Sequence, residues 1–389
     1  MIDSDAARRR QEMLSAPSDR LALLDCLRGV AVLAVIALHS GGHGLRSNDH
    51  FFAYAIWPVL RHGYLGVQLF FVISGYCIMA AAVSVQSDKT PLRTFIRRRV
   101  RRIFPPFWCS LGLVIGLGLL TVIVAKKTWW SIFPLNALDW LWNILLLQGP
   151  FNAPDASMVY WSLSIEVQFY GLMAIAVVAG RWKAVWLLGL SGLYLSWVWQ
   201  PWFRIGGTAL AYWPEFASGI AAYLAVNWRV WGRSLPAVLW GLSAAAILVG
   251  WQTSPVVFAA DGEFATPYKQ LFCLLCGLGV WGGHCFEGSG RPFVCLRPLA
   301  WIGTISYSLY LTHEPVATRV FNLAGRLFDL GGLRWVPVAV LASIAQLLVG
   351  WLFFRYCERP WLNRSSRAAR RSVDMANPAT PAVTKVIVG

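Results

Sequence analysis

Long apolar stretches alternate with short polar and basic stretches along almost the whole chain. A helix that crosses a hydrocarbon core of about 30 Å needs roughly 17 to 25 mostly apolar residues, because its backbone amides must be satisfied within the segment. About ten stretches meet this length. They are 21–40, 65–85, 107–125, 160–179, 184–200, 207–226, 235–252, 268–285, 299–316 and 335–356. The pattern predicts an all-α integral membrane protein, a bundle of about ten transmembrane helices.

The remaining stretches complete the expected organisation. The apolar patch 138–147 is too short to cross, so we expect an interfacial or re-entrant helix there. The first long stretch follows a basic start and ends without a small-residue cleavage site, which is typical of an uncleaved signal anchor. We therefore expect a cytoplasmic N-terminal segment at 1–20, a transmembrane domain at 21–362 and a disordered cytoplasmic tail at 363–389.

Composition excludes a soluble globule, since 57% of the 389 residues are hydrophobic and only 13% are charged. The formal net charge of +16 would suit a nucleic-acid partner, but the basic residues lie mostly between apolar stretches. Cytoplasmic loops hold excess Lys and Arg, so both chain ends are predicted to be cytoplasmic and no nucleic acid is expected. The predicted inner loops carry Arg93, Arg97, Arg98, Arg99, Arg101 and Arg102, then Arg181 and Lys183, Arg229 and Arg233, Arg291 and Arg297, and finally Arg359 to Arg371.

Cysteine usage gives little sign of disulfides or of a metal site. The eight cysteines are spread through apolar stretches and none is paired in a predicted outer loop, so they are expected to be small core residues. Cys273 and Cys276 form a single C-x-x-C without a second pair or a histidine at ligand spacing, so we expect no metal there.

Arg28 and His39 lie eleven positions apart in the first apolar stretch. At about 100° per residue they share one helix face, and a rise of about 16 Å places His39 toward the outer end. An arginine within a span costs roughly 2.5 to 3.5 kcal/mol on insertion, which favours a functional partner, although snorkelling toward the headgroups also accounts for it. His39 is suited to take a proton from a hydroxyl near neutral pH, or to be a hydrogen-bonded histidine of the bundle.

The basic sequence FIRRRVRRIFPPFW forms a predicted inner loop just before a membrane entry. Such clusters set topology beside anionic lipid, and planar guanidinium groups also bind phosphate in a bidentate manner. Position and density leave both interpretations open.

Two further stretches place ionisable groups inside spans. YWSLSIEVQFYG puts Glu166 about two turns into a helix entered from outside, where it would orient the imidazole if it neighbours His39. The alternative is a carboxylate stabilised near a helix N-terminus. ISYSLYLTHEP places His313 and Glu314 in the outer half of a span, which we expect to end at Pro315.

Intramembrane charges of this kind mark enzymes and transporters alike, so a proton-coupled transporter of a small solute stays open beside a membrane enzyme. A structural scaffold is a third option and predicts that Arg28, His39 and Glu166 tolerate neutral substitution.

Several ordered motifs together resemble the integral-membrane acyltransferase family 3, over about residues 24–360. They are Arg28-x10-His39 after LDCLRG, GVQLFFVISGY, RRVRRIFP, WSLSIEVQFY, ISYSLYLTHEP and the closing Glu358-Arg359-Pro360. Tyr76, Trp108 and Glu314 depart from the residues commoner in that family.

The resemblance implies roles for individual residues. His39 is similar to the essential histidine, as general base; Arg28 is its partner, Glu166 the acidic position, and Arg99 and Arg102 the R-x-x-R pair of the acyl-CoA site, with Arg98 beside them. His313, Ser74 and Tyr307 lie in the same motifs and are additional candidates.

The resemblance also implies an activity. It is transfer of an acyl group, acetyl in the simplest case, from cytoplasmic acyl-CoA to a hydroxyl of an extracytoplasmic or lipid-linked glycan. The implied protein is a single-domain enzyme of the bacterial inner membrane that uses acyl-CoA as co-substrate and holds no bound cofactor.

Overall fold

The computed structural model describes residues 22–44, 55–133, 135–198, 207–253, 266–287, 297–331 and 334–362. The expected N-terminal segment 1–20 and the tail 363–389 lie outside these residues. Within the described ranges all regular elements are helical. The longer helices are α2 Ala22–Gly44, α4 Leu65–Ser84, α5 Pro91–Ala125, α7 Tyr160–Ala179, α8 Lys183–Val198, α9 Trp213–Val226, α11 Ser234–Thr253, α12 Thr266–Glu287, α14 Ser306–Leu327 and α15 Trp335–Phe353.

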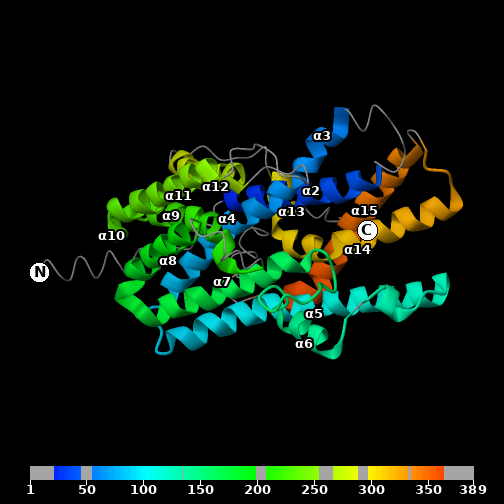
Figure 1. Cartoon of the computed structure of the whole chain (residues 1–389), viewed down its shortest axis with the longest axis horizontal. Helices are drawn as coiled ribbons and strands as arrows, with labels where there is room; N and C mark the ends of the chain where they lie inside the picture. Colours follow the sequence, from blue (N-terminus) through cyan, green and yellow to red (C-terminus); the bar gives the residue numbers. More distant parts are fainter. Residues whose placement is uncertain are drawn as a thin grey trace, which may run out of the picture.

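Shorter pieces join the long helices. They are α3 Trp57–Leu60, α6 Ala137–Leu145, α10 Trp228–Trp231 and α13 Arg297–Thr304, with helical turns at Arg61–Tyr64, Trp129–Ser131, Gly180–Trp182, Ala209–Tyr212, Phe354–Glu358 and Arg359–Trp361. Figure 1 places α8 to α11 toward one end of an elongated bundle and α14 and α15 toward the other, with α2, α4 and α7 between them.

Each of the ten predicted apolar stretches overlaps at least one helix among the described residues, but the count of ten crossings is not confirmed. Among the described residues six helices are long and apolar enough to span a membrane. They are Leu23–Gly42, Trp57–Ser84, Pro91–Val124, Tyr160–Ala179, Ser234–Gln252 and Trp335–Trp361, and the shorter Lys183–Val198 is also apolar. The chain is thus an all-helical protein with several potential membrane spans, and the number and direction of the crossings stay predictions.

The patch 138–147 forms the short helix α6, as its length indicates. The side chain of Asn136 accepts a hydrogen bond from the backbone N–H of Asp139, and the Asp139 carboxylate accepts one from the backbone N–H of Asn136. This capping box fixes where the helix begins. Nine residues rise only about 14 Å, too little to cross a hydrocarbon core.

The basic stretch predicted as an inner loop is helical, which corrects that expectation. It belongs to α5, a helix of 35 residues that begins at Pro91 and contains Pro105 and Pro106. Arginine is a good helix former, and proline suits the first helical turn. A helix of this length extends about 52 Å, so its basic N-terminal third can leave the hydrocarbon core without unwinding.

The expected helix end at Pro315 is also wrong, since α14 continues through this proline to Leu327. A proline removes the hydrogen bond to the carbonyl four residues earlier, here that of Leu311. The hydroxyl of Ser110 on α5 donates to the Leu311 carbonyl oxygen at 3.0 Å. A neighbouring side chain therefore replaces the lost backbone bond, as membrane helices allow. The predicted stretch 299–316 is accordingly divided between α13 and α14, which meet at Ile305.

Glycines bring the central helices into close contact. A Cβ on Gly75 of α4 would collide with the Phe216 carbonyl of α9, and one on Gly219 of α9 would collide with the Val72 carbonyl of α4. A Cβ on Gly303 of α13 would collide with the Asp25 carbonyl of α2. Small residues permit such backbone approach, which replaces the missing hydrophobic driving force between helices in lipid. These contacts hold α4 and α2, which carry much of the site described next.

Candidate active site

One cavity of about 760 Å3, including its open mouth, lies inside the bundle. Its wall comes from α2, α4, α5, α7 and α14 and consists of Arg28, Val67, Phe70, Phe71, Ile73, Ser74, Cys77, Ile78, Arg99, Arg102, Ile103, Ser162, Leu163, Glu166, Tyr170, Ser306, Tyr307 and Tyr310. The cavity thus brings together Arg28, Arg99, Arg102, Glu166, Ser74 and Tyr307 from the residues predicted from the sequence. Arg98, His39 and His313 do not line it.

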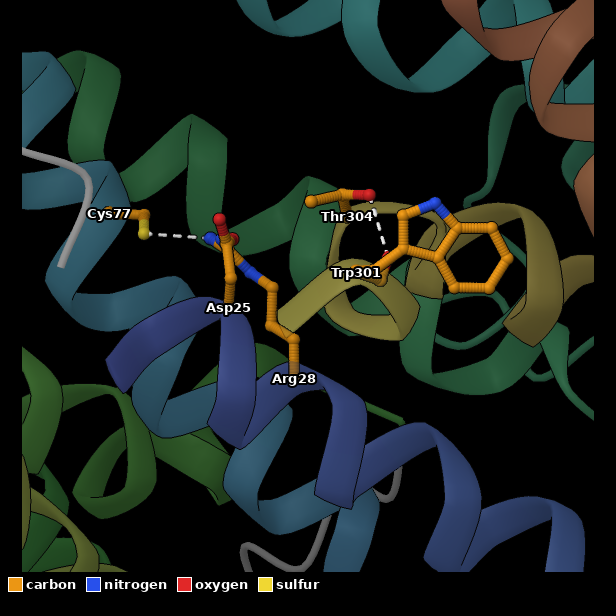
Figure 2. Close-up of polar contacts among 5 residues, drawn as sticks. All are labelled: Asp25, Arg28, Cys77, Trp301 and Thr304. Atoms are coloured by element: carbon orange, nitrogen blue, oxygen red, sulfur yellow. Dashed lines mark hydrogen bonds and ion pairs between the residues drawn. The ribbon is translucent and has the colours of Figure 1, made fainter. Parts of the chain in front are cut away.

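Arg28 lies at the cavity wall between two polar partners. Its guanidinium donates to the Asp25 carboxylate at 2.8 Å and to the Cys77 sulfur of α4 at 3.0 Å. Figure 2 shows the side chain reaching from α2 toward Cys77, with Asp25 one turn earlier on the same helix. The Arg28 and Asp25 side chains are only 16% and 12% exposed, so the ion pair compensates a charge that would be costly alone. The guanidinium therefore has its polar partners within the bundle.

The arginines of α5 lie on different faces of the helix, and only some of them face the cavity. Arg99 and Arg102 are three residues apart and both line the cavity, whereas Arg98 lies 3.9 Å from Asp88 with 41% of its side chain exposed. The Arg99 guanidinium lies over the rings of Phe95 and Tyr170, at 5.9 and 5.8 Å from their centroids. Its buried Nε–H has no hydrogen-bond partner among the described residues. An anionic oxygen in the cavity would supply that partner.

Glu166 lies in the cavity and has partners other than His39. Its Oε1 accepts hydrogen bonds from the Ser74 hydroxyl at 3.0 Å and from the Tyr170 hydroxyl at 2.7 Å. Within the described part of the chain it makes no bond to His39, so the condition for an orienting role is not met. Two neutral donors hold the carboxylate in place instead, beside Arg99 and Arg102 in the same cavity wall.

His39 contacts a second histidine. The His39 Nδ1 atom lies 2.9 Å from the Val35 carbonyl oxygen and 3.2 Å from Nε2 of His313 on α14. The two ring centroids are 5.0 Å apart. The Nδ1 of His313 lies 2.8 Å from the Tyr310 carbonyl oxygen, and His313 is fully buried. The two predicted histidines, 274 residues apart in the chain, therefore form one pair.

Tyr310 connects this histidine pair to the cavity. Its ring lies 5.7 Å from that of His313, while the same side chain lines the cavity. Its hydroxyl is held by Ser162 at 2.6 Å. The cavity thus reaches the residue next to the histidines without including either imidazole in its wall.

Two more motif residues hold helices together at the cavity. The hydroxyl of Tyr307 donates to the Ile103 carbonyl of α5 at 3.0 Å, and Ser308 donates to the buried Glu358 carboxylate at 2.6 Å. Glu358 belongs to the closing Glu-Arg-Pro sequence, so this motif anchors the chain after α15 against α14. Glu314, for its part, accepts from Thr318 at 2.9 Å within α14.

Sequence reasoning missed Asp25, Cys77, Tyr170, Ser162 and Tyr310 as site residues. Each of them lies three or four residues from a predicted site residue on the same helix, the spacings at which helical side chains meet. Asp25 has this relation to Arg28, Cys77 to Ser74, Ser162 and Tyr170 to Glu166, and Tyr310 to Tyr307. The spacing does not show which helices pack together, so the bonds of Cys77 to Arg28 and of Tyr310 to Ser162 were not predictable.

A profile of the family described as an acyltransferase domain matches residues 21–355. The chain is 27% identical over 377 residues to BcsY of Komagataeibacter xylinus, whose name describes a membrane-bound transacylase, with 91% of this chain and 87% of BcsY covered. It is 29% identical over 339 residues to the exopolysaccharide production protein ExoZ of Rhizobium meliloti, covering 82% of this chain and 95% of ExoZ.

It is also 27% identical over 379 residues to the peptidoglycan O-acetyltransferase OatA of Listeria monocytogenes, covering 87% of this chain but only 55% of OatA. No solved structure matches.

Proposed function

The chain belongs to the acyltransferase-domain family that the profile defines over residues 21–355, and we propose that it moves an acyl group from acyl-CoA to a hydroxyl of an extracytoplasmic or lipid-linked glycan. An O-acetyltransferase of this kind resides in the bacterial inner membrane. Relatives named for peptidoglycan O-acetylation and exopolysaccharide production support a glycan acceptor and an acetyl group.

The observation that supports the donor most is the cavity with three guanidinium groups. Arg28, Arg99 and Arg102 meet there on helices far apart in sequence, and the buried Nε–H of Arg99 lacks a partner. Coenzyme A is a polyanion, and guanidinium groups bind phosphate oxygens through paired, charge-assisted hydrogen bonds. The exposed Arg102 and half-buried Arg99 would hold the phosphates, leaving the thioester arm to extend toward Arg28 and Tyr310.

His39 would serve as general base for the acceptor. Its Nδ1 faces a carbonyl oxygen, so Nδ1 carries the hydrogen and Nε2 carries the lone pair. Nε2 takes the proton of the acceptor hydroxyl while the hydroxyl oxygen attacks the thioester carbonyl. The C–S bond then breaks, and the CoA thiolate leaves and receives the proton back from His39. Base assistance of this kind contributes about a hundred- to ten-thousandfold in rate.

The test is acetyl transfer by the purified full chain in lipid nanodiscs, with labelled acetyl-CoA and cell-surface glycans as acceptor. We expect labelled glycan and free CoA in equal amounts, and His39→Ala should lower kcat by about a hundred- to ten-thousandfold. Mass spectrometry of glycans from cells with and without the gene identifies the acceptor by a gain of one acetyl group. Movement of a solute along a proton gradient without consumption of acyl-CoA would support the transporter instead and overturn the proposal.

A further inference from the structure

We propose that His313 is a positioning residue that holds the ring of His39 in its orientation, an inference that rests on the proposed role of His39 as general base. The pair is not part of the cavity wall, and among the described residues no hydrogen bond joins His39 to a carboxylate, although the Glu314 carboxylate interacts with it electrostatically. The contact between the rings, with Nε2 of His313 at 3.2 Å from Nδ1 of His39, is therefore the side-chain interaction that can orient the base.

Hydrogen positions follow from the backbone partners of both rings. A carbonyl oxygen only accepts, so Nδ1 of His313 carries a hydrogen toward Tyr310, and Nδ1 of His39 carries one toward Val35. In a neutral His313 the Nε2 atom is then an acceptor. It faces the Nδ1–H of His39, whose hydrogen is shared between the Val35 carbonyl and His313.

This arrangement leaves the Nε2 lone pair of His39 for the reaction. When His39 takes a proton there, positive charge spreads to Nδ1–H and strengthens its bonds to His313 and Val35. The carboxylate of hydrolytic triads has the same position relative to its histidine. His313 differs because it is neutral, so it orients the ring of His39 without itself adding a negative charge to the membrane interior.

Burial and neighbouring hydrogen bonds hold the ring of His313 in one position. His313 is fully buried on α14, and its neighbours Thr312 and Tyr310 are held by Ser308 and Ser162. Pro315 lies two residues further on, where Ser110 keeps the helix intact. The ring is thus fixed on a supported part of α14 rather than on a helix end.

Two substitutions distinguish the roles of the two ring nitrogens of His313. The amide of glutamine lies near the Nε2 position of a histidine, so His313→Gln can retain an acceptor for His39. The amide of asparagine lies near the Nδ1 position, so His313→Asn can retain the donor to Tyr310 but offers His39 nothing. His284 on α12 provides a histidine remote from this pair, and His284→Gln serves as control.

We expect His313→Asn to lower kcat about 10- to 100-fold, within the range that base catalysis contributes, with the KM for acetyl-CoA unchanged. His313→Gln should recover most of this loss, and His284→Gln should match the unaltered chain. Equal activity of the Gln and Asn variants, or a loss confined to KM, would overturn the proposal. If one of the two variants fails to fold, the other is compared with the unaltered chain and with His39→Ala. His313→Gln should keep a kcat well above that of His39→Ala, and His313→Asn should fall well below the unaltered chain.

A second readout does not require turnover. Solid-state NMR of the 15N-histidine chain in lipid, with His39 assigned by its loss in His39→Gln, reports which ring nitrogen carries hydrogen. We expect Nδ1–H with unprotonated Nε2 in every chain, because the Val35 carbonyl still accepts from Nδ1, but a shifted and broadened Nδ1 signal in His313→Asn, where the bond to residue 313 is lost. An unchanged His39 spectrum in His313→Asn would refute the positioning role. If acetyl transfer itself is absent, the proposed function fails, but the spectrum still shows whether His313 holds the ring of His39.

Discussion

At the scale of single residues, Arg98 and Arg99 form a matched pair on adjacent positions of α5. Arg99 should matter for donor binding because it lines the cavity with an unpartnered Nε–H, whereas Arg98 faces Asp88. We expect Arg99→Gln to raise the KM for acetyl-CoA about 10- to 100-fold, as loss of charged hydrogen bonds worth about 1.5 to 3 kcal/mol implies. Arg98→Gln should change it less than threefold, since exposed ion pairs contribute about 0 to 1 kcal/mol.

A truncated donor checks the chemical cause of that effect. Acetyl-pantetheine carries the thioester without the phosphates, so its KM should be high for the unaltered chain and nearly insensitive to Arg99→Gln. Equal sensitivity of the two donors would mean that Arg99 contacts the thioester arm or supports the fold. Initial rates at varied donor concentration in nanodiscs measure both parameters.

The residues that carry this site were only partly predictable. Helical spacing predicted that Arg28 and His39 share a face of their helix, but it could not predict Cys77 of α4, which accepts a hydrogen bond from Arg28. The sequence left open whether Glu166 neighbours His39. In the structure Glu166 accepts from Ser74 and Tyr170, and His39 contacts His313. Which helices pack side by side depends on glycine contacts such as Gly75 with Phe216, and periodicity carries no information about partners.

At the scale of helices, the continuity of α14 depends on a side chain from α5. We expect Ser110→Ala to destabilise the chain by about 1 to 3 kcal/mol, because the Leu311 carbonyl loses its donor inside the bundle. Pro315→Ala restores a backbone N–H that can bond to Leu311 itself. In the double variant the cost of Ser110→Ala should fall by at least half.

Thermal unfolding of the four chains in one detergent measures this coupling. Ser110 also lies 2.9 Å from the Tyr160 hydroxyl, so part of the Ser110→Ala cost should remain in the double variant. Purely additive effects would show that Ser110 does not replace the proline's missing bond. The sequence reading ended the helix at Pro315 because only a neighbouring helix reveals the donor; where no such compensation was needed, as in α7 or α11, apolar length alone located the helix.

At the scale of the whole molecule, the distribution of arginines indicates from which side of the membrane the donor enters the cavity. Six arginines lie between positions 93 and 102 at the start of α5, and two of them line the cavity together with Arg28. His39 follows Arg28 by eleven residues on α2, about 16 Å further along the helix. Arginine-rich segments stay on the cytoplasmic side, so the donor should enter from the cytoplasm while His39 lies nearer the opposite face.

Vesicle orientation tests this arrangement, because acyl-CoA is a polyanion that does not cross a bilayer. Inside-out vesicles should consume acetyl-CoA from the medium, whereas right-side-out vesicles should be at least tenfold slower until they are permeabilised. Permeabilised samples of both kinds give the total enzyme present and correct for mixed orientation. Faster consumption of acetyl-CoA by intact right-side-out vesicles than by intact inside-out vesicles would place the basic end of α5 on the outer side. The acceptor hydroxyl would then meet the histidine pair from the cytoplasm, and the glycan would have to be modified before export.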